Sequence, residues 1–191
     1  MEATAFLRGL DALVVTLYTG VPDSQLKGLC DALYLRFGTG GRHVVAADEG
    51  GAVGLAAGHY IATGRPALVY LQNSGLGHAA NPIASLLDPR VYGIPCVFAV
   101  GWRGEPGVPD EPQHVLQGEI TPGMLTLLGL PFFVLGRDTG PEAFDGMIRQ
   151  AREHVSQGRS VAFLVGKGAL PGGEKPGYQG LGVLAIESEV R

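Results

Sequence analysis

Residues 43–71 read HVVAADEGGAVGLAAGHYIATGRPALVYL, and this stretch decides the fold. Its first five residues are an apolar, β-rich run, and residues 67–71 are another. Between them, residues 50–63 are small and apolar with helical character, and a glycine and a proline end that pattern. A strand, a helix and a strand in this order predict a parallel βαβ unit with a right-handed crossover.

The same alternation continues on both sides of this unit. We expect further strands at residues 12–18, 94–100, 132–135 and 160–165. We expect further helices at residues 24–37, 79–87, 122–128 and 141–157. The alternation predicts an α/β fold, a doubly wound and mostly parallel six-stranded sheet with helices on both faces. Because no repeat or linker is visible, we expect one domain over residues 1–168 and a C-terminal tail over residues 169–191.

The composition argues against several classes of protein. The 191 residues are 46% hydrophobic, the formal net charge is −4, and lysine and arginine do not cluster, so a nucleic-acid partner is not expected. No run approaches the roughly 18–20 apolar residues of a membrane span. Cys30 and Cys96 form no CxxC pair, and buried free thiols fit a reducing compartment. Without a visible signal peptide, we expect a cytoplasmic protein.

Glu49 is the first candidate for a functional residue. It follows a predicted strand directly, and in sheets of this kind ligands bind at the carboxyl ends of the strands. An acid at a helix N-terminus gains about 0.3–1 kcal/mol from the helix dipole, but Asp48 already suits that role. The alternative is a carboxyl held among glycine and alanine so that another molecule can pack closely against it. Both interpretations remain open on the pattern alone.

Two polar loops are predicted at the same edge of the sheet. Residues 72–78, QNSGLGH, offer amide and hydroxyl partners but carry no phosphate-binding fingerprint, and an ordinary polar turn is an equal alternative. Residues 101–114, GWRGEPGVPDEPQH, are too long for a simple connection and end in His114. Because no cluster of histidine, cysteine and aspartate has zinc spacing, we predict no metal site on this chain.

Four stretches together carry a family resemblance. They are TGVPDSQLKGLC at 19–30, AADEGGAVGLAAGHYIATG at 46–64, LVYLQNSGLGHAANPIASLLDP at 68–89 and IPCVFAVGWRGEPGVPDEPQHVLQG at 94–118. Over about residues 15–168 the chain resembles the pyrimidine-binding (Pyr), N-terminal domain of thiamine-diphosphate-dependent decarboxylases, which has a flavodoxin-like fold. Among these enzymes, the chain resembles the phosphonopyruvate decarboxylases most and the sulfopyruvate decarboxylases next.

The resemblance implies a role for Glu49 in activating the cofactor. In the family, the matching glutamate hydrogen-bonds N1′ of the aminopyrimidine of thiamine diphosphate and so promotes loss of the thiazolium C2 proton. The resemblance also implies that the loop carrying Gln72, Asn73, Ser74 and Gly75 approaches the pyrimidine end of the cofactor.

The resemblance implies catalytic roles for three more residues. Asp23 or Ser24 matches a polar residue that contacts substrate or moves a proton, and which of the two aligns stays open. His114 resembles a histidine near the reacting carbons. Arg103 and Lys27 are our candidates for holding a phosphonate or a sulfonate, because Arg forks suit such anions, and a site built by the partner chain is an equal alternative.

The Gly-Asp-Gly stretch that binds Mg²⁺ and the diphosphate in the family is not found in this sequence. We therefore expect a β subunit that carries the Mg²⁺ and the diphosphate-binding domain, in an α2β2 or larger assembly with self-association. The expected reaction converts the small 2-oxo acid phosphonopyruvate to phosphonoacetaldehyde and CO2. A sulfopyruvate decarboxylase α subunit and a non-catalytic, flavodoxin-like regulatory subunit are the alternatives.

Overall fold

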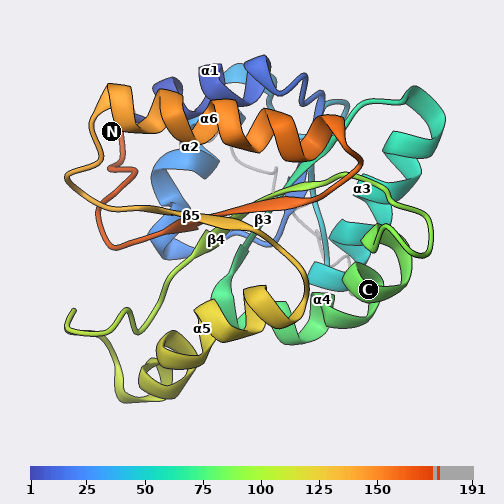
Figure 1. Ribbon diagram of the computed structural model, residues 1–191. Helices are drawn as coiled ribbons and strands as arrows, with labels where there is room; N and C mark the ends of the chain where they lie inside the picture. Colours follow the sequence, from blue (N-terminus) through green and yellow to red (C-terminus); the bar gives the residue numbers. More distant parts are fainter. Residues whose placement is uncertain (174–175, 177–191) are drawn as a thin grey trace, which may run out of the picture.

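The computed structural model describes residues 1–173 and residue 176, and they form a single six-stranded sheet covered by helices (Figure 1). The strands are β1 (Leu17–Gly20), β2 (His43–Val45), β3 (Ala67–Gln72), β4 (Val97–Gly101), β5 (Phe132–Leu135) and β6 (Val161–Val165). Their order is β2-β1-β3-β4-β6-β5, and every neighbouring pair is parallel. The expected α/β fold is confirmed.

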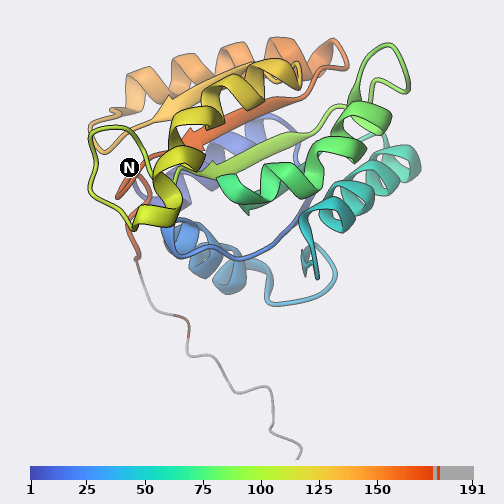
Figure 2. The ribbon, with the colours of Figure 1, turned by 90° about the horizontal axis from the view of Figure 1, so that it is seen from below.

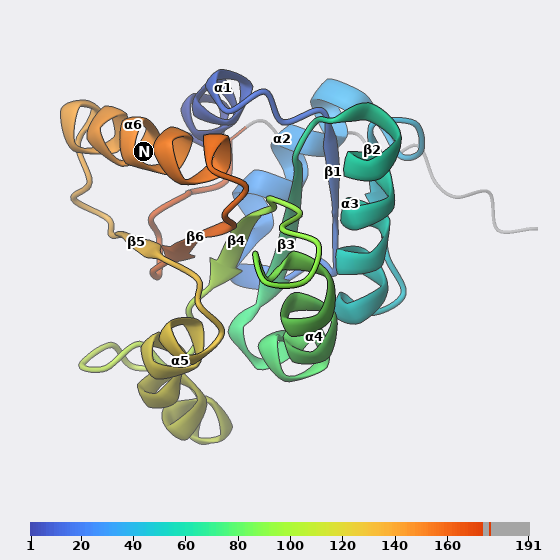
Figure 3. The ribbon, with the colours of Figure 1, turned by 45° about the vertical axis from the view of Figure 1, so that its right-hand side comes forward.

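Helices cover both faces of the sheet (Figure 3). They are α1 (Ala3–Ala12), α2 (Lys27–Phe37), α3 (Glu49–Thr63), α4 (Leu76–Pro82), α5 (Val115–Leu127) and α6 (Pro141–Ser156). Short 3-10 helices η1 (Ser24–Leu26), η2 (Asn73–Gly75) and η4 (Pro112–His114) precede α2, α4 and α5, and a π-helical turn η3 (Ile83–Leu87) extends α4. The helices α1, α2 and α6 bury one face, and α3, α4 and α5 bury the other.

The two faces are filled in different ways. Where α1 and α6 cover the sheet, Phe6 meets Phe163 edge to face with ring centroids 5.3 Å apart, a contact that adds about 0.5–1.5 kcal/mol to the burial of both rings. On the other face, α3 packs through small residues, of which Ala52 and Ala56 are buried. A helix with such a face lies close to the sheet.

The strand expected at residues 12–18 is present as β1, but its start was predicted five residues too early. Residues 3–12 form α1, whose Phe6, Leu7 and Leu10 are buried at helical spacing, and β1 starts only at Leu17. Between the two elements the chain turns at Val14, which has a φ of 58°. The β-branched valines at this turn produced the false strand signal.

Two predicted helices begin earlier than expected. The helix expected at residues 122–128 begins at Val115, and its first turns include Gly118, which packs so closely on the backbone of Gly104 that an added Cβ would lie 1.7 Å from its carbonyl oxygen. The loop expected at residues 72–78 is instead the helical turn η2 followed by α4. Sequence patterns do not register such contacts between distant segments.

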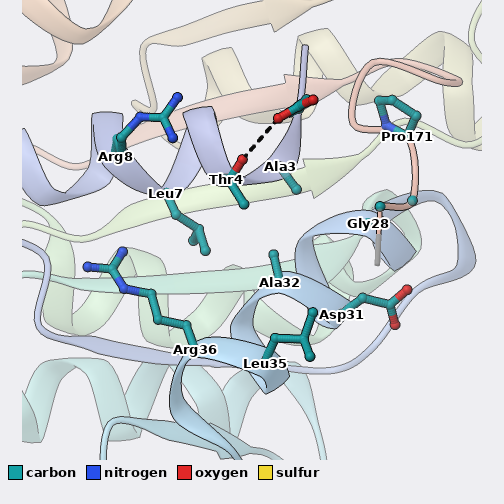
Figure 4. Close-up of a pocket in the computed structure, with 13 residues that line it drawn as sticks. Ala3, Thr4, Leu7, Arg8, Gly28, Asp31, Ala32, Leu35, Arg36 and Pro171 are labelled. Carbon is teal, nitrogen blue, oxygen red and sulfur yellow. Dashed lines mark hydrogen bonds between the residues drawn. The ribbon is translucent and has the colours of Figure 1, made fainter. Parts of the chain in front are cut away.

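The domain extends past residue 168. Ala169 and Leu170 are buried in the core beside α1, although we expected the tail to begin there. The carbonyl oxygens of Leu170 and Pro171 lie where a Cβ at Gly28 would be, at 2.5 and 2.6 Å, so α2 and this segment touch backbone to backbone (Figure 4). Most of the expected tail, residues 174–175 and 177–191, lies outside the described residues. Within the described residues no helix is long and apolar enough to span a membrane.

Thr19 in β1 provides a test of how the core is packed. Its side chain is buried, and Oγ1 has no hydrogen-bond partner in the described part of the chain. An unpaired buried hydroxyl costs about 1–3 kcal/mol, so the near-isosteric Thr19→Val should raise the melting temperature by a few degrees. Thr121 is the matched control, because its buried hydroxyl accepts a hydrogen bond from Asn73 and donates one to Gln117, and Thr121→Val should lower that temperature. Equal effects of the two substitutions would contradict this description of the core.

His43 in β2 predicts how stability depends on pH. Its ring nitrogens lie 2.8 Å from the Gly38 carbonyl oxygen and 2.9 Å from the Tyr70 hydroxyl, and burial lowers the pKa of His43 below the ordinary 6.5. The unfolded chain therefore binds a proton at His43 more readily than the folded chain does. The contribution of neutral His43 to the free energy of unfolding is full above about pH 6.5 and is lost as the pH falls through the lowered pKa. We expect the melting temperature to drop below about pH 6.5, and to drop less in His43→Gln. An unchanged slope in that variant would show that His59 and His154, whose pKa values burial also lowers, account for it alone.

Candidate active site

The carboxyl ends of β1, β2, β3 and β4 lie at one edge of the sheet, and each is followed by a polar segment that the sequence analysis selected. The strand order reverses its direction between β1 and β3, and ligands bind at such a switch point. In Figure 2 the β4–α5 loop, the start of α2 and the segment after β6 gather at this edge. The sheet thus collects side chains from distant parts of the chain.

Asp48, and not Glu49, caps helix α3. The Asp48 carboxylate accepts a hydrogen bond of 2.7 Å from the Gly51 N–H, and its backbone is extended, as expected of an N-cap residue. Glu49 is the first residue of the helix, and its carboxylate does not cap the helix. The sequence left open whether Glu49 only stabilises the start of the helix. Asp48 already fills that role, so it does not explain Glu49.

The Glu49 side chain lies across Gly75 at the start of α4. A Cβ added to Gly75 would be 2.5 Å from Oε1 and 2.6 Å from the carboxyl carbon, so any side chain at position 75 would displace this carboxylate. Oε2 lies 2.9 Å from Nδ1 of His78, one turn further along α4. The Glu49 side chain is 13% exposed and the His78 side chain 75% exposed. The carboxylate is therefore largely covered, oriented by two neighbours, and next to an open edge.

His78 is a site residue that the sequence analysis did not select. Its spacing from Gly75 is the only signal in the sequence, since three residues along a helix place it on the same side as the glycine. The contact with Glu49 comes from a different element and has no pattern of its own.

Asn73 forms buried hydrogen bonds that connect three segments of the site. Its side chain is fully buried, its amide nitrogen donates to the Arg103 carbonyl at 2.8 Å and to the Thr121 hydroxyl at 2.9 Å, and its Oδ1 accepts from the Arg103 N–H at 3.2 Å. Asn73 thus ties the ends of β3 and β4 to α5 and does not face the open edge. The side chains of Gln72 and Ser74 are not part of this buried network, and the Gln72 amide donates a hydrogen bond of 2.7 Å to the Ser74 hydroxyl.

Asp23 is buried at the end of β1, and its carboxylate fits against Gly101 of β4. A Cβ at Gly101 would lie 2.5 Å from Oδ2, which also accepts the Gln25 N–H at 3.0 Å. Burial raises the pKa of Asp23, while bonds from backbone N–H groups and the charge of Arg103 oppose that rise. Asp23 therefore keeps a proton more readily than an exposed aspartate, as a group that moves protons requires. Its neighbour Ser24 is exposed, and the Arg103 guanidinium approaches the Ser24 hydroxyl at 3.4 Å.

The two predicted substrate-binding cations already have carboxylate partners. Arg103 forms a bidentate pair with Asp110 at 2.8 and 2.5 Å, and this pairing holds the pKa of Asp110 well below its usual range. Lys27 bonds the nearly buried Asp31 at 2.5 Å. These pairs fix where both cations lie.

The structure therefore assembles the predicted residues in two groups along one edge. Glu49 lies with the η2 turn, and Asp23, Ser24, Lys27 and Arg103 lie around the start of α2. His114 ends η4, is partly exposed, and its ring makes no hydrogen bond to any residue the structure describes. Nor do the described residues contain a group of three acidic, histidine or cysteine side chains able to hold a metal ion.

Comparison with known proteins identifies the family. The model of the thiamine pyrophosphate enzymes, N-terminal TPP binding domain, matches residues 2–124. A phosphonopyruvate decarboxylase of Streptomyces hygroscopicus is 36% identical over 171 residues, which cover 89% of this chain and 41% of that protein. A sulfopyruvate decarboxylase subunit alpha of Methanococcus maripaludis is 31% identical over 152 residues, which cover 79% of this chain and 86% of that subunit.

A solved structure supports the fold. The putative thiamin diphosphate-dependent enzyme from Mycobacterium smegmatis superimposes with a TM-score of 0.57 at 21% identity, covering 92% of this chain and 33% of that one. The chain spans less than half the length of the phosphonopyruvate decarboxylase it matches. The resemblance seen in the four motifs is confirmed: the chain belongs to the thiamine pyrophosphate enzymes and carries their N-terminal, TPP-binding domain.

Proposed function

We propose that this chain is the cofactor-activating α subunit of a decarboxylase that converts phosphonopyruvate to phosphonoacetaldehyde and CO2. The observation that carries the proposal is the position of the Glu49 carboxylate, held over Gly75 at the ligand-binding edge of the sheet. The similarity to phosphonopyruvate decarboxylase supports the choice of substrate. A sulfopyruvate decarboxylase is the second candidate, because the chain covers 86% of such a subunit.

The residues around Glu49 fit the pyrimidine end of thiamine diphosphate. A carboxylate is a suitable partner for a protonated ring nitrogen, and the Glu49 carboxylate lies close against the backbone at Gly75. When bound, the cofactor's thiazolium takes up the electron pair released as CO2 leaves. Gln72, Ser74 and the backbone of Gly75 would hold the cofactor on the α4 side.

The chain's own groups would orient the cofactor and move protons. Glu49 would hold the proton at N1′, and His78 would fix the orientation of the carboxylate through its other oxygen. Asp23, with its raised pKa, is suited to carry a proton beside the substrate, with the Ser24 hydroxyl next to it. His114, at the end of η4, would lie near the reacting carbons, as the matching histidine of the family does.

A partner chain would supply the second wall of the site. The sequence has no Gly-Asp-Gly stretch for Mg²⁺ and diphosphate, and relatives named subunit alpha imply a β subunit in those proteins. Directly after His114, α5 exposes the apolar Val115, Leu116 and Ile120, with Leu116 67% exposed, as an interface helix would. We propose an α2β2 or larger, cytoplasmic assembly, and the two free thiols fit that compartment.

Substituting Glu49 tests the proposal most simply. In the complex reconstituted with the β subunit, Glu49→Gln should reduce CO2 release from phosphonopyruvate by about 100-fold or more, because an amide cannot exchange the proton. Glu142→Gln, an exposed glutamate on α6, is the matched control and should keep full activity. Undiminished turnover in Glu49→Gln would favour a non-catalytic regulatory subunit.

The close contact at Gly75 offers a second test. Gly75→Ala should displace the Glu49 carboxylate and lower kcat by about 10-fold or more, since small displacements of catalytic groups are costly. Gly77→Ala, two residues on, meets no atom within 4 Å of the new Cβ and should leave kcat unchanged. If both variants kept wild-type kcat while folding normally, the position of this carboxylate would not matter for catalysis.

A further inference from the structure

Three cations from three distant segments line one cavity of about 390 Å³ at the edge of the sheet. Lys27 comes from the start of α2, Arg103 from the β4–α5 loop, and Lys167 from the segment after β6. The cavity also includes Ser24 and a single carboxylate, that of Asp110. Since its lining carries more positive than negative charge, it suits an anionic ligand.

Each cation has a hydrogen-bond partner that restrains it. The Asp110 carboxylate accepts hydrogen bonds from Nε and one terminal nitrogen of Arg103. The other terminal nitrogen lies 3.4 Å from the Ser24 hydroxyl. Lys27 is anchored by Asp31, whose side chain is only 3% exposed. The Lys167 ammonium donates one hydrogen bond, to the Pro109 carbonyl at 2.9 Å, and an ammonium has three donors. Each of the three cations therefore has at least one bond that restrains its side chain at the cavity, and Arg103 has the most.

We propose that this cavity binds a tetrahedral oxyanion and that, resting on the proposed function, the oxyanion is the phosphonate of the substrate. Arg and Lys side chains with a hydroxyl group are the donors that such anions attract. The N-terminal end of α2 adds its dipole at the same place. Lys167, which no sequence motif indicated, is the new member of the site.

Two residues that line the cavity are connected to the rest of the candidate active site. Ser24 follows Asp23 in the chain, and the Arg103 backbone is bonded to Asn73, two residues before the glycine beneath Glu49. A substrate with an anionic group beyond its oxo acid would use these donors. Pyruvate has a methyl group at that position and would gain nothing from these donors, so the cavity would favour substrates that carry a second anionic group.

A larger cavity of about 660 Å³, shown in Figure 4, shares Gly28 and Pro171 with this one. It is lined by Arg8 but not by Arg103 or Lys167. Arg8 therefore offers a cation nearby that belongs to a different cavity, which makes Arg8→Gln a matched control for loss of charge.

The test uses the full chain alone, titrated with inorganic phosphate and followed by amide NMR. We expect saturable shifts concentrated at Ser24, Arg103 and Lys167. Lys167→Met should weaken the phosphate affinity about 10-fold, Lys167→Arg should restore most of it, and Arg8→Gln should change it little. Shifts that are absent or do not saturate, or an unchanged affinity in Lys167→Met, would overturn the proposal.

A second arm separates this site from the proposed function. In the reconstituted complex, Lys167→Met should lower kcat/KM for phosphonopyruvate about 10-fold more than it lowers kcat/KM for pyruvate. A parallel loss for both substrates would mean that Lys167 only holds the β4–α5 loop through Pro109, and the proposal would fail. Phosphate binding at these residues in a complex that decarboxylates neither acid would refute the proposed function and leave the oxyanion site intact.

Discussion

The contact between the Glu49 carboxylate and Gly75 is the constraint on which the rest of the site depends. A side chain at position 75 would occupy the place of the carboxylate, and Asp48 leaves Glu49 without a capping role. The sheet brings these residues together, because β2 ends before Glu49 and β3 ends before the turn that carries Gly75. A largely covered carboxylate at the open end of a parallel sheet is poorly explained by helix stability alone, and it is well placed to meet a ligand.

Buried polar bonds keep that edge rigid. The Asn73 amide cannot be solvated, so its bonds to Arg103 and Thr121 must all be present in the folded state. These bonds join the turn beneath Glu49 to the β4–α5 loop, and Asp110 holds the same loop through Arg103. The two groups of candidate residues are therefore positioned by one connected network, which is what a preorganised site requires.

The sequence was sufficient for the fold but only partly for the site. Strands such as β3 and β6 and the helix α6 carry strong periodic patterns, and their positions were predicted to within a residue or two. The helix α1 was missed, because the valines that follow it resemble a strand and because its packing on β6 has no local signal. The buried Leu170 was assigned to a tail for a similar reason, since glycine and proline around it suggest a loop.

The positions of Glu49, Asp23 and Arg103 at one edge followed from the alternation of strands and helices. The roles of His78 and Lys167 could not be predicted in this way. His78 contacts a residue 29 positions away and Lys167 one 58 positions away. Which face a side chain presents can be inferred from periodicity, but which distant group it meets depends on tertiary packing. The capping role of Asp48 likewise depends on its hydrogen bond from the Gly51 N–H, which the sequence alone does not specify.

The most direct measurement is an experimental structure of this chain with its β subunit and thiamine diphosphate. The account predicts that a Glu49 carboxylate oxygen lies within hydrogen-bond distance, about 2.6–3.2 Å, of N1′ of the pyrimidine, with the diphosphate held by the other chain. A cofactor bound elsewhere, or a Glu49 side chain turned away from the ring toward solvent or its own core, would contradict it.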